Sequence, residues 1–237
     1  MKRKPIKLKR MEITEFIENL KEQFEGGKIK YPKNLKLVNI RGCNGAGKST
    51  VPIQMLMRDK AVFILTHKGK DRATVFPNFN FIAMGLYRTK TGGLDGYPNN
   101  ATTLEILELL HKIPMNILME GVISSTIFST YAKLFTEIEK RNDPKRKVII
   151  INLLPPLEVC FERIKKRSPE KFEKIKKDQV ESKWRTIQKN AKKFQEVGLT
   201  SLLVDNSKVK LEETVDWFLN LVKGKGGVDE YGTSQGA

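Results

Sequence analysis

Apolar residues follow two spacings along the chain, one typical of helices and one typical of buried strands. Helical spacing predicts an amphipathic helix at 12–24, which Gly26 and Gly27 end. Short apolar runs predict strands at 35–40, 61–65, 116–119, 147–154 and 200–204, with a further strand or hairpin arm over 79–86. Helical patterns predict helices at 50–58, 102–110, 125–141, 156–167, 168–196 and 211–222, the second with a capping box at Thr102 and Glu105.

Strands and helices therefore alternate along most of the chain, and no internal repeat is present. Such alternation is typical of a mostly parallel sheet covered by helices on both faces. The pattern predicts a doubly wound α/β fold, in which ligands bind at the carboxyl ends of the strands.

A glycine-rich segment lies where the first of these central strands meets a helix. Residues 42–49 match the phosphate-loop pattern G-x-x-x-x-G-K-[ST] at every fixed position. Glycines let successive backbone N–H groups point inward at phosphate oxygens, and Lys48 adds a charge within reach of the terminal phosphates. The Ser49 hydroxyl is a candidate ligand for Mg²⁺. The residues expected to hold ATP are Gly42, Cys43, Asn44, Gly45, Ala46, Gly47, Lys48, Ser49 and Thr50.

The phosphate loop alone does not separate kinases from GTPases and motors. A guanine-reading N-K-x-D after a strand is absent, because Asn206 is followed by Ser207 and Lys208. Larger motor cores do not fit into 237 residues. The pattern therefore favours a kinase with the P-loop NTPase fold, similar to nucleotide kinases. We expect a basic N-terminal extension and helix at 1–33, a P-loop kinase domain at 34–223 and a flexible tail at 224–237.

Phosphoryl transfer needs a carboxylate, and two segments offer one. Glu120 follows the strand at 116–119, where it could serve Mg²⁺ or take a proton from the acceptor. Asp95 is the second candidate base, in a loop between a strand and a helix. Residues expected to bind the acceptor substrate in this loop are Arg88, Lys90, Gly92, Gly93 and Asp95.

A run of cations at 163–167 follows the most apolar strand, where nucleotide kinases carry a basic lid. Arg163 and Arg167 are one helical turn apart and could both stabilise charge on the transferred phosphoryl group. An equally good interpretation is a solvated basic helix face. Trp184 is expected to pack its helix against the core.

The charge of the chain indicates a class of binding partner. The chain has 44 Lys and Arg against 27 Asp and Glu, a net charge of +17. Residues 163–193 hold thirteen basic and four acidic residues, which is about half of the excess. Such clustering favours a polyanion such as nucleic acid. Two cysteines, Cys43 and Cys160, and the lack of a signal or membrane segment predict a cytoplasmic protein.

Three motifs together resemble a known family. They are G-C-N-G-A-G-K-S at 42–49, G-L-Y-R-T-K-T-G-G-L-D-G at 85–96 and L-M-E-G-V-I-S-S at 118–125. This set is similar to bacteriophage P-loop kinases related to thymidylate kinase, whose studied members are 5-hydroxymethyldeoxyuridine (5-hmdU) DNA kinases. The resemblance covers most of 35–222 and places the protein in the host cytoplasm if a phage encodes it.

The resemblance implies an activity: ATP with Mg²⁺ would phosphorylate the 5-hydroxymethyl group of bases within DNA, a step in thymidine hypermodification. Residues 42–50 would bind ATP, Glu120 would serve Mg²⁺ or the hydroxymethyl proton, and 88–96 would line the acceptor site. Three alternatives stay open from the residues alone: a deoxynucleoside monophosphate kinase, a DNA-binding module switched by nucleotide, and a polynucleotide end kinase. The sequence leaves the oligomeric state and the identity of the base open.

Overall fold

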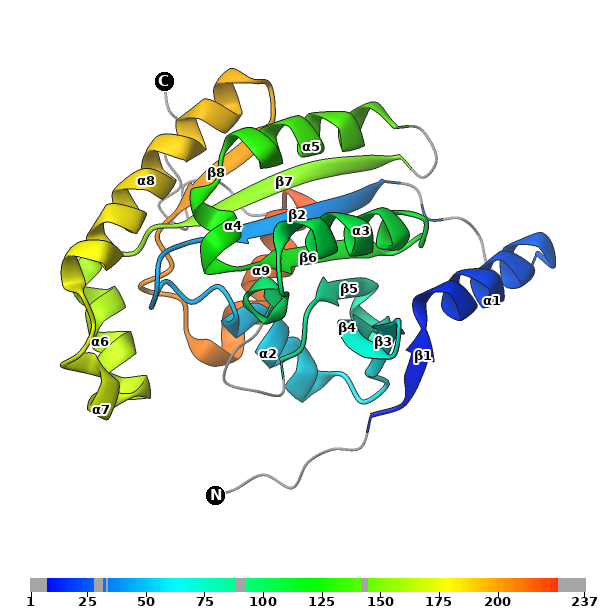
Figure 1. Ribbon diagram of the computed structural model, residues 1–237, viewed down its shortest axis with the longest axis horizontal. Coiled ribbons are helices and arrows are strands. Elements are labelled where there is room, and N and C mark those ends of the chain that lie inside the picture. The colour runs from blue at the N-terminus through cyan, green and yellow to red at the C-terminus, as the bar shows by residue number, and fades with distance from the viewer. Residues whose placement is uncertain (1–7, 28–31, 33, 88–92, 142–144, 226–237) are drawn as a thin grey trace.

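The computed structural model of the protein describes residues 8–27, 32, 34–87, 93–141 and 145–225 (Figure 1). The strands are β1 (Arg10–Glu12), β2 (Leu35–Arg41), β3 (Phe63–His67), β4 (Lys70–Phe76), β5 (Phe81–Met84), β6 (Asn116–Glu120), β7 (Arg146–Leu153) and β8 (Thr200–Val204). The helices are α1 (Ile13–Glu25), α2 (Thr50–Arg58), α3 (Asn100–His111), α4 (Val122–Thr126), α5 (Ser129–Lys140), α6 (Leu157–Arg167), α7 (Pro169–Phe172), α8 (Lys177–Glu196) and α9 (Thr214–Lys223). Short 3-10 helices are η1 (Pro77–Phe79), η2 (Gly93–Gly96) and η3 (Leu211–Glu213).

The strands form one sheet in the order β1-β3-β4-β5-β6-β2-β7-β8. Neighbours run parallel except where β4 pairs with β3 and with β5. In the centre, Ile40 of β2 lies in register with Glu120 of β6 and Ile151 of β7. The mostly parallel α/β sheet predicted from the sequence is therefore confirmed, and the carboxyl ends of its central strands lie side by side.

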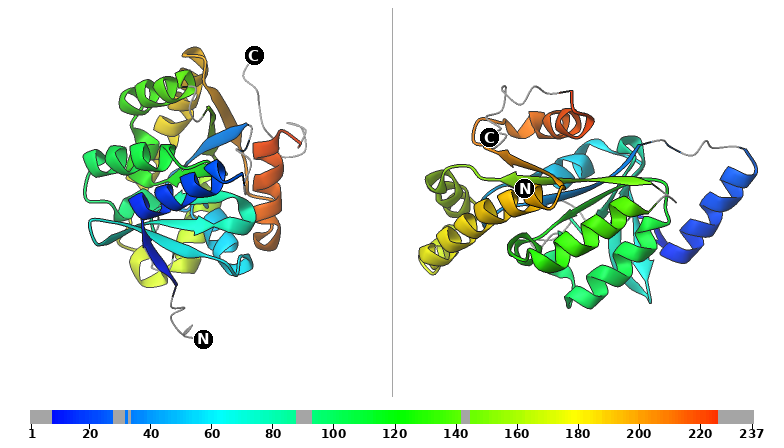
Figure 2. Two further views of the ribbon diagram at one scale, coloured as in Figure 1. Left: turned by 90° about the vertical axis from the view of Figure 1, so that its right-hand side faces the viewer. Right: turned by 90° about the horizontal axis from the view of Figure 1, so that it is seen from above.

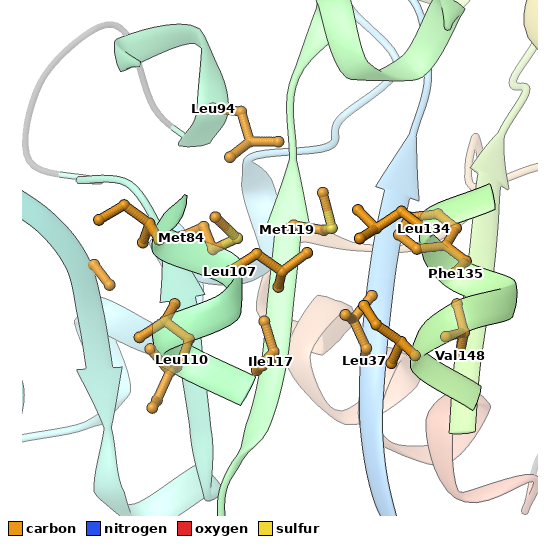
Figure 3. Close-up of a cluster of buried hydrophobic side chains, with 14 of the residues drawn as sticks. Leu37, Met84, Leu94, Leu107, Leu110, Ile117, Met119, Leu134, Phe135 and Val148 are labelled. Atoms are coloured by element: carbon orange, nitrogen blue, oxygen red, sulfur yellow. The ribbon is translucent and has the colours of Figure 1, made fainter. Parts of the chain in front are cut away.

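Helices cover both faces of the sheet, as Figure 2 shows. Leu37 belongs to a buried cluster that includes residues of α1, α3 and α5 on one face, and the adjacent Val38 belongs to a second cluster with residues of α2, α6 and α9 on the other. Figure 3 shows part of the first cluster, where Leu107 of α3 lies beside Ile117 and Met119 of β6. Because both faces are buried, the middle of each central strand is mostly apolar, and polar residues such as Arg41 and Glu120 stand near the strand ends.

The described part of the N-terminal extension joins this core. Strand β1 pairs in parallel with β3, and Ile13 and Ile17 of α1 are buried in the first cluster. The predicted hairpin arm at 79–86 is confirmed as β5, which pairs with β4. Strand β4 itself was missed because it begins with polar residues. It follows a two-residue turn in which Lys68 and Gly69 both have positive φ, at 52° and 71°, as type I′ hairpins require.

Two predicted helix features are wrong. The helix expected at 125–141 is two helices, α4 and α5, because Arg41 binds the carbonyl oxygens of Ser125 and Ile127 at the junction, at 2.6 and 2.9 Å. The capping box at Thr102 and Glu105 does not form. Asn99 caps α3 by accepting the Thr102 N–H at 2.8 Å, and Glu105 binds Lys68 and His67 instead.

The long helix expected at 168–196 is also interrupted. It consists of α7 and the 20-residue α8, separated by a turn in which the Ile175 N–H donates to the Phe172 oxygen. Ile175 and Phe172 pack against the second cluster, which explains the break. Trp184 of α8 packs there too and donates its ring N–H to Pro155, as expected. Among the described residues, no helix is long and apolar enough to cross a membrane.

Candidate active site

The phosphate loop at 42–50 joins the end of β2 to the start of α2, at the centre of the sheet. Gly45 and Gly47 have φ values of 81° and 94°, a region that favours glycine. A Cβ atom on Gly45 would lie 2.3 Å from the carbonyl oxygen of Cys160. Glycine at this position thus allows both the turn of the loop and its close contact with α6.

Lys48 is buried beneath this loop, with 6% of its surface exposed. Its Nζ donates to the carbonyl oxygen of Cys43 at 3.1 Å. Burial lowers the pKa of Lys48, and the negative charges of Glu120 and Asp95 partly offset the effect. A buried ammonium group with so little solvation is suited to bind phosphate oxygens directly.

Glu120 ends β6 directly beside the loop and is 1% exposed. Its Oε1 accepts a hydrogen bond from the Ser49 hydroxyl at 3.1 Å. Burial raises the pKa of Glu120, while the charge of Lys48 opposes the rise. The two residues predicted to serve Mg²⁺ therefore lie in contact. Oxygen ligands of this kind fit a hard divalent ion that keeps several waters and binds substrate phosphates.

Asp95 belongs to η2, which packs against the same strand end. A Cβ atom on Gly93 would lie 2.2 Å from Glu120 Oε1, so the backbone of η2 lies directly on that carboxylate. Asp95 Oδ1 accepts the Val122 N–H at 3.0 Å, and the residue is exposed. Of the two candidate bases, Asp95 therefore faces solvent and Glu120 is enclosed.

A buried network links the phosphate loop to the Glu120 segment. The Ser125 hydroxyl accepts the Gly42 N–H at 3.2 Å and donates to the carbonyl oxygen of Gly121 at 2.5 Å. Arg41 is fully buried between the rings of Tyr131 and Phe194. Burial lowers its pKa to about 9. The same arginine that separates α4 from α5 thus fixes Ser125 against the loop.

Helix α6 and the segment after β8 hold the other side of the loop. Arg163 donates to the side-chain and backbone oxygens of Asn206 at 3.3 and 3.0 Å and to the Ala46 oxygen at 3.4 Å. Asn206 Nδ2 also donates to the Ala46 oxygen, at 3.0 Å. Arg163 is thus a brace of the loop as well as a cation beside it.

These groups surround one cavity of about 640 Å³. It is lined by Asp95 and by Arg163, Lys166 and Arg167 of α6. Six residues of the phosphate loop also line it: Asn44, Gly45, Gly47, Lys48, Ser49 and Thr50. Of the other expected ATP ligands, Gly42 donates to Ser125, whereas Cys43 and Ala46 are buried in the core. The expected substrate residues Arg88, Lys90 and Gly92 lie outside the described residues.

Three functional residues were missed by sequence reasoning. Arg41 precedes one recognised motif and Ser125 is the last residue of another, but no local pattern shows that they meet across 84 residues of chain. Asn206 was considered only as part of a guanine-reading motif. Its position after the last strand, at the carboxyl edge of the sheet, was the available signal.

Comparison with known proteins identifies the family. Residues 23–215 match the sequence pattern of a family described as 5-hmdU DNA kinase. The chain belongs to this family. It is 61% identical over 214 residues to the 5-hmdU DNA kinase of Bacillus phage SP10. The aligned residues make up 90% of this chain and 33% of that relative. The chain thus spans about a third of the length of the SP10 protein.

Shorter 5-hmdU DNA kinases match over most of their length. The 5-hmdU DNA kinase 1 of Salmonella phage ViI is 28% identical over 196 residues, which are 80% of this chain and 86% of the length of that relative. Among solved structures, the YorR protein of Bacillus subtilis in complex with phosphorylated GDP is 16% identical, with a TM-score of 0.48. That likeness covers 79% of this chain and 96% of YorR.

Proposed function

We propose that this protein uses ATP to phosphorylate the 5-hydroxymethyl group of 5-hydroxymethyluracil bases within DNA. Family membership supports the acceptor. The contact between the phosphate loop and the acceptor side carries the proposal: Ser49 touches Glu120, and η2 packs against Glu120 beside the same cavity. A triphosphate on the loop would thus lie next to an acceptor held by the η2 segment.

In this proposal the phosphate loop holds ATP through its inward N–H groups and Lys48. Ser49 and Glu120 are the residues that would hold Mg²⁺, which would supply neutralising charge at the phosphates. Arg167 and Arg163 line the cavity opposite and stabilise charge spread over the transferred group.

Asp95 is the proposed base, because it is exposed and lines the cavity whereas Glu120 is enclosed beside Ser49. Its carboxylate takes the proton of the hydroxymethyl group as that oxygen bonds to the γ-phosphorus. The bond to the β–γ bridging oxygen breaks, giving ADP and a phosphomethyl base. The surrounding groups act mainly by position and charge, as is usual for phosphoryl transfer.

DNA is proposed as the partner, bound over the basic α6–α7 side of the cavity. In Figure 1 these helices and the start of α8 lie at one end of the molecule, away from α1. Lys165, Lys166 and Arg167 are all exposed there. Cations in this position would neutralise phosphates on either side of the modified base.

The test is phosphate transfer from ATP to three acceptors in parallel: duplex DNA with 5-hmdU, the same duplex with thymidine, and free thymidine monophosphate. Digestion to nucleosides and mass spectrometry then locate the new phosphate. We expect a phosphomethyl nucleoside from the first duplex alone. Transfer to the monophosphate alone, or to 5′ ends of both duplexes, would contradict the proposal.

A further inference from the structure

The two cysteines of the chain lie in contact beneath the phosphate loop. Cys43 belongs to the loop and Cys160 to α6, 117 residues later, and their Sγ atoms are 3.6 Å apart. Both side chains are fully buried. Neither thiol has a role in the proposed transfer reaction, yet the contact between them joins two parts of the ATP site.

Their surroundings make the two thiols unequal. The hydrogen bond with Cys160 lowers the pKa of Cys43, and the nearby positive charge of Lys48 lowers it further. The same hydrogen bond and burial raise the pKa of Cys160. A thiolate is the form that reacts with oxidants and disulfides. The 3.6 Å contact places each sulfur where it can complete a disulfide with the other, and the directions of the two pKa shifts favour Cys43 as the attacking sulfur.

We propose that Cys43 and Cys160 form a reversible disulfide under oxidising conditions and that this bond switches off the nucleotide site. With a peroxide as oxidant, the Cys43 thiolate bonds to one peroxide oxygen, the O–O bond breaks, and the released hydroxide is protonated to water. Cys160 then attacks the resulting sulfenic sulfur. The S–S bond forms, the S–O bond breaks, and a second water leaves with the Cys160 proton. A cellular dithiol reverses the reaction by exchange.

We expect the disulfide to distort the loop, because the two sulfur atoms must move closer together within a tightly packed region. A disulfide needs a sulfur separation near 2.05 Å, so the two sulfurs must approach by about 1.5 Å. Gly45 already packs against the carbonyl oxygen of Cys160, where even a Cβ atom would be too close. We therefore expect the loop or α6 to move when the bond forms. The loss of ATP binding rests on the proposed role of this loop, whereas disulfide formation does not.

The experiment oxidises the reduced full chain with diamide, which joins thiols without adding oxygen to sulfur. Peptide mapping without reductant, and titration of a fluorescent ATP analogue, follow. We expect a linked peptide pair containing Cys43 and Cys160 and an ATP affinity at least about tenfold weaker, since displacements near 1 Å are costly at such sites. Dithiothreitol should restore the affinity.

Cys160→Ala is the matched control, with Cys160→Ser as a second variant that keeps a similar volume. Diamide should leave the ATP affinity of either variant unchanged. No linked pair in the wild type, or a linked pair with unchanged affinity, would overturn the proposal. If the reduced wild type binds no ATP, the proposed function fails instead, and the peptide map still tests the disulfide.

Discussion

Glu120 and Asp95 lie beside the same loop in different surroundings, and this difference assigns their proposed roles. Glu120 is enclosed and bonded to Ser49, whereas Asp95 is exposed and accepts a hydrogen bond from the Val122 N–H. Lys48, also buried, is turned to the carbonyl of its own loop. Single substitutions at these residues should therefore have separable effects.

Replacement of Lys48 by alanine should lower kcat for phosphate transfer by at least about a hundredfold, because a preorganised charge at the phosphates is lost. Radiolabel transfer from ATP to 5-hmdU DNA measures it. Lys60→Ala is the control, an exposed lysine just beyond the far end of α2. Equal activity of the two variants would refute the role of Lys48.

Asp95→Asn should lower kcat by roughly a hundredfold, as loss of a general base does, and leave the Mg²⁺ concentration for half-maximal rate unchanged. Glu120→Gln should raise that Mg²⁺ concentration. Steady-state rates over a Mg²⁺ titration separate the two. The reverse pattern would exchange the roles of the two carboxylates.

In the absence of nucleotide, Glu120→Gln should raise the stability of the folded protein, and the gain should be larger at higher pH. Because the folded-state pKa of Glu120 is raised above its ordinary value of 4.5, the folded protein holds this proton more tightly than the unfolded chain. That contribution is complete below the ordinary pKa and is lost as pH rises through the folded pKa. The Tm of the variant minus that of the wild type should thus increase with pH, as thermal unfolding at a series of pH values measures. A Tm difference that decreases as pH rises would contradict a raised pKa of Glu120 in the folded protein.

At the scale of elements, the site depends on how α4 meets the phosphate loop. Arg41 donates hydrogen bonds to two carbonyl oxygens at the end of α4. The Ser125 hydroxyl forms hydrogen bonds with both Gly42 and Gly121. This arrangement fixes the end of β6, which carries Glu120, relative to the loop. Ser125 is therefore a positioning residue.

Ser125→Ala should lower kcat about tenfold with little change in KM for ATP, because a shift between loop and Glu120 affects the aligned transition state most. It also leaves the Gly42 N–H without its acceptor, at a cost of about 1–3 kcal/mol. Ser125→Thr retains the hydroxyl and should recover most of the rate. Ser124→Ala is the matched control, since Ser124 is buried and donates to the Gly121 oxygen, and no hydrogen bond from its hydroxyl to the phosphate loop is present among the described residues. An equal loss of kcat in both alanine variants would contradict this role.

At the scale of the whole molecule, charge is distributed unevenly. Helix α1 has four glutamates and one lysine, whereas residues 163–193 have thirteen basic and four acidic residues. The α6–α7 segment lies beside the cavity and α1 at the other end of the sheet (Figure 1). A polyanion would therefore be drawn to the site end of the molecule.

Lys174→Gln with Lys176→Gln should weaken binding of a 5-hmdU duplex and lower the slope of log K against log salt by about 1.8, the value for two lost phosphate contacts. Fluorescence anisotropy at several salt concentrations measures both. The control pair, Lys112→Gln with Lys140→Gln, removes the same charge from exposed positions at the carboxyl ends of α3 and α5. These helix ends precede the amino ends of β6 and β7, whereas the site lies at the carboxyl ends of the strands. Equal slopes for the two pairs would contradict a localised DNA surface.

Much of the fold could be predicted because the dominant signal is local. Buried parallel strands such as β2 and β7 are apolar on both faces, and the phosphate loop needs its glycines and lysine at fixed spacing. These constraints act over a few residues, so they are visible in sequence. Strand β4 was not predicted, because its first residues are polar and its formation depends on pairing with β3 and β5.

Local residue patterns were therefore enough to predict the sheet class, the phosphate loop and the two candidate carboxylates. The folded structure was needed to show that Arg41 divides α4 from α5, that Glu120 is enclosed while Asp95 is exposed, and that Cys43 touches Cys160. Each of these depends on burial and on contacts between residues tens of positions apart. Such contacts arise from packing of the whole chain, and no local spacing of residue types encodes them.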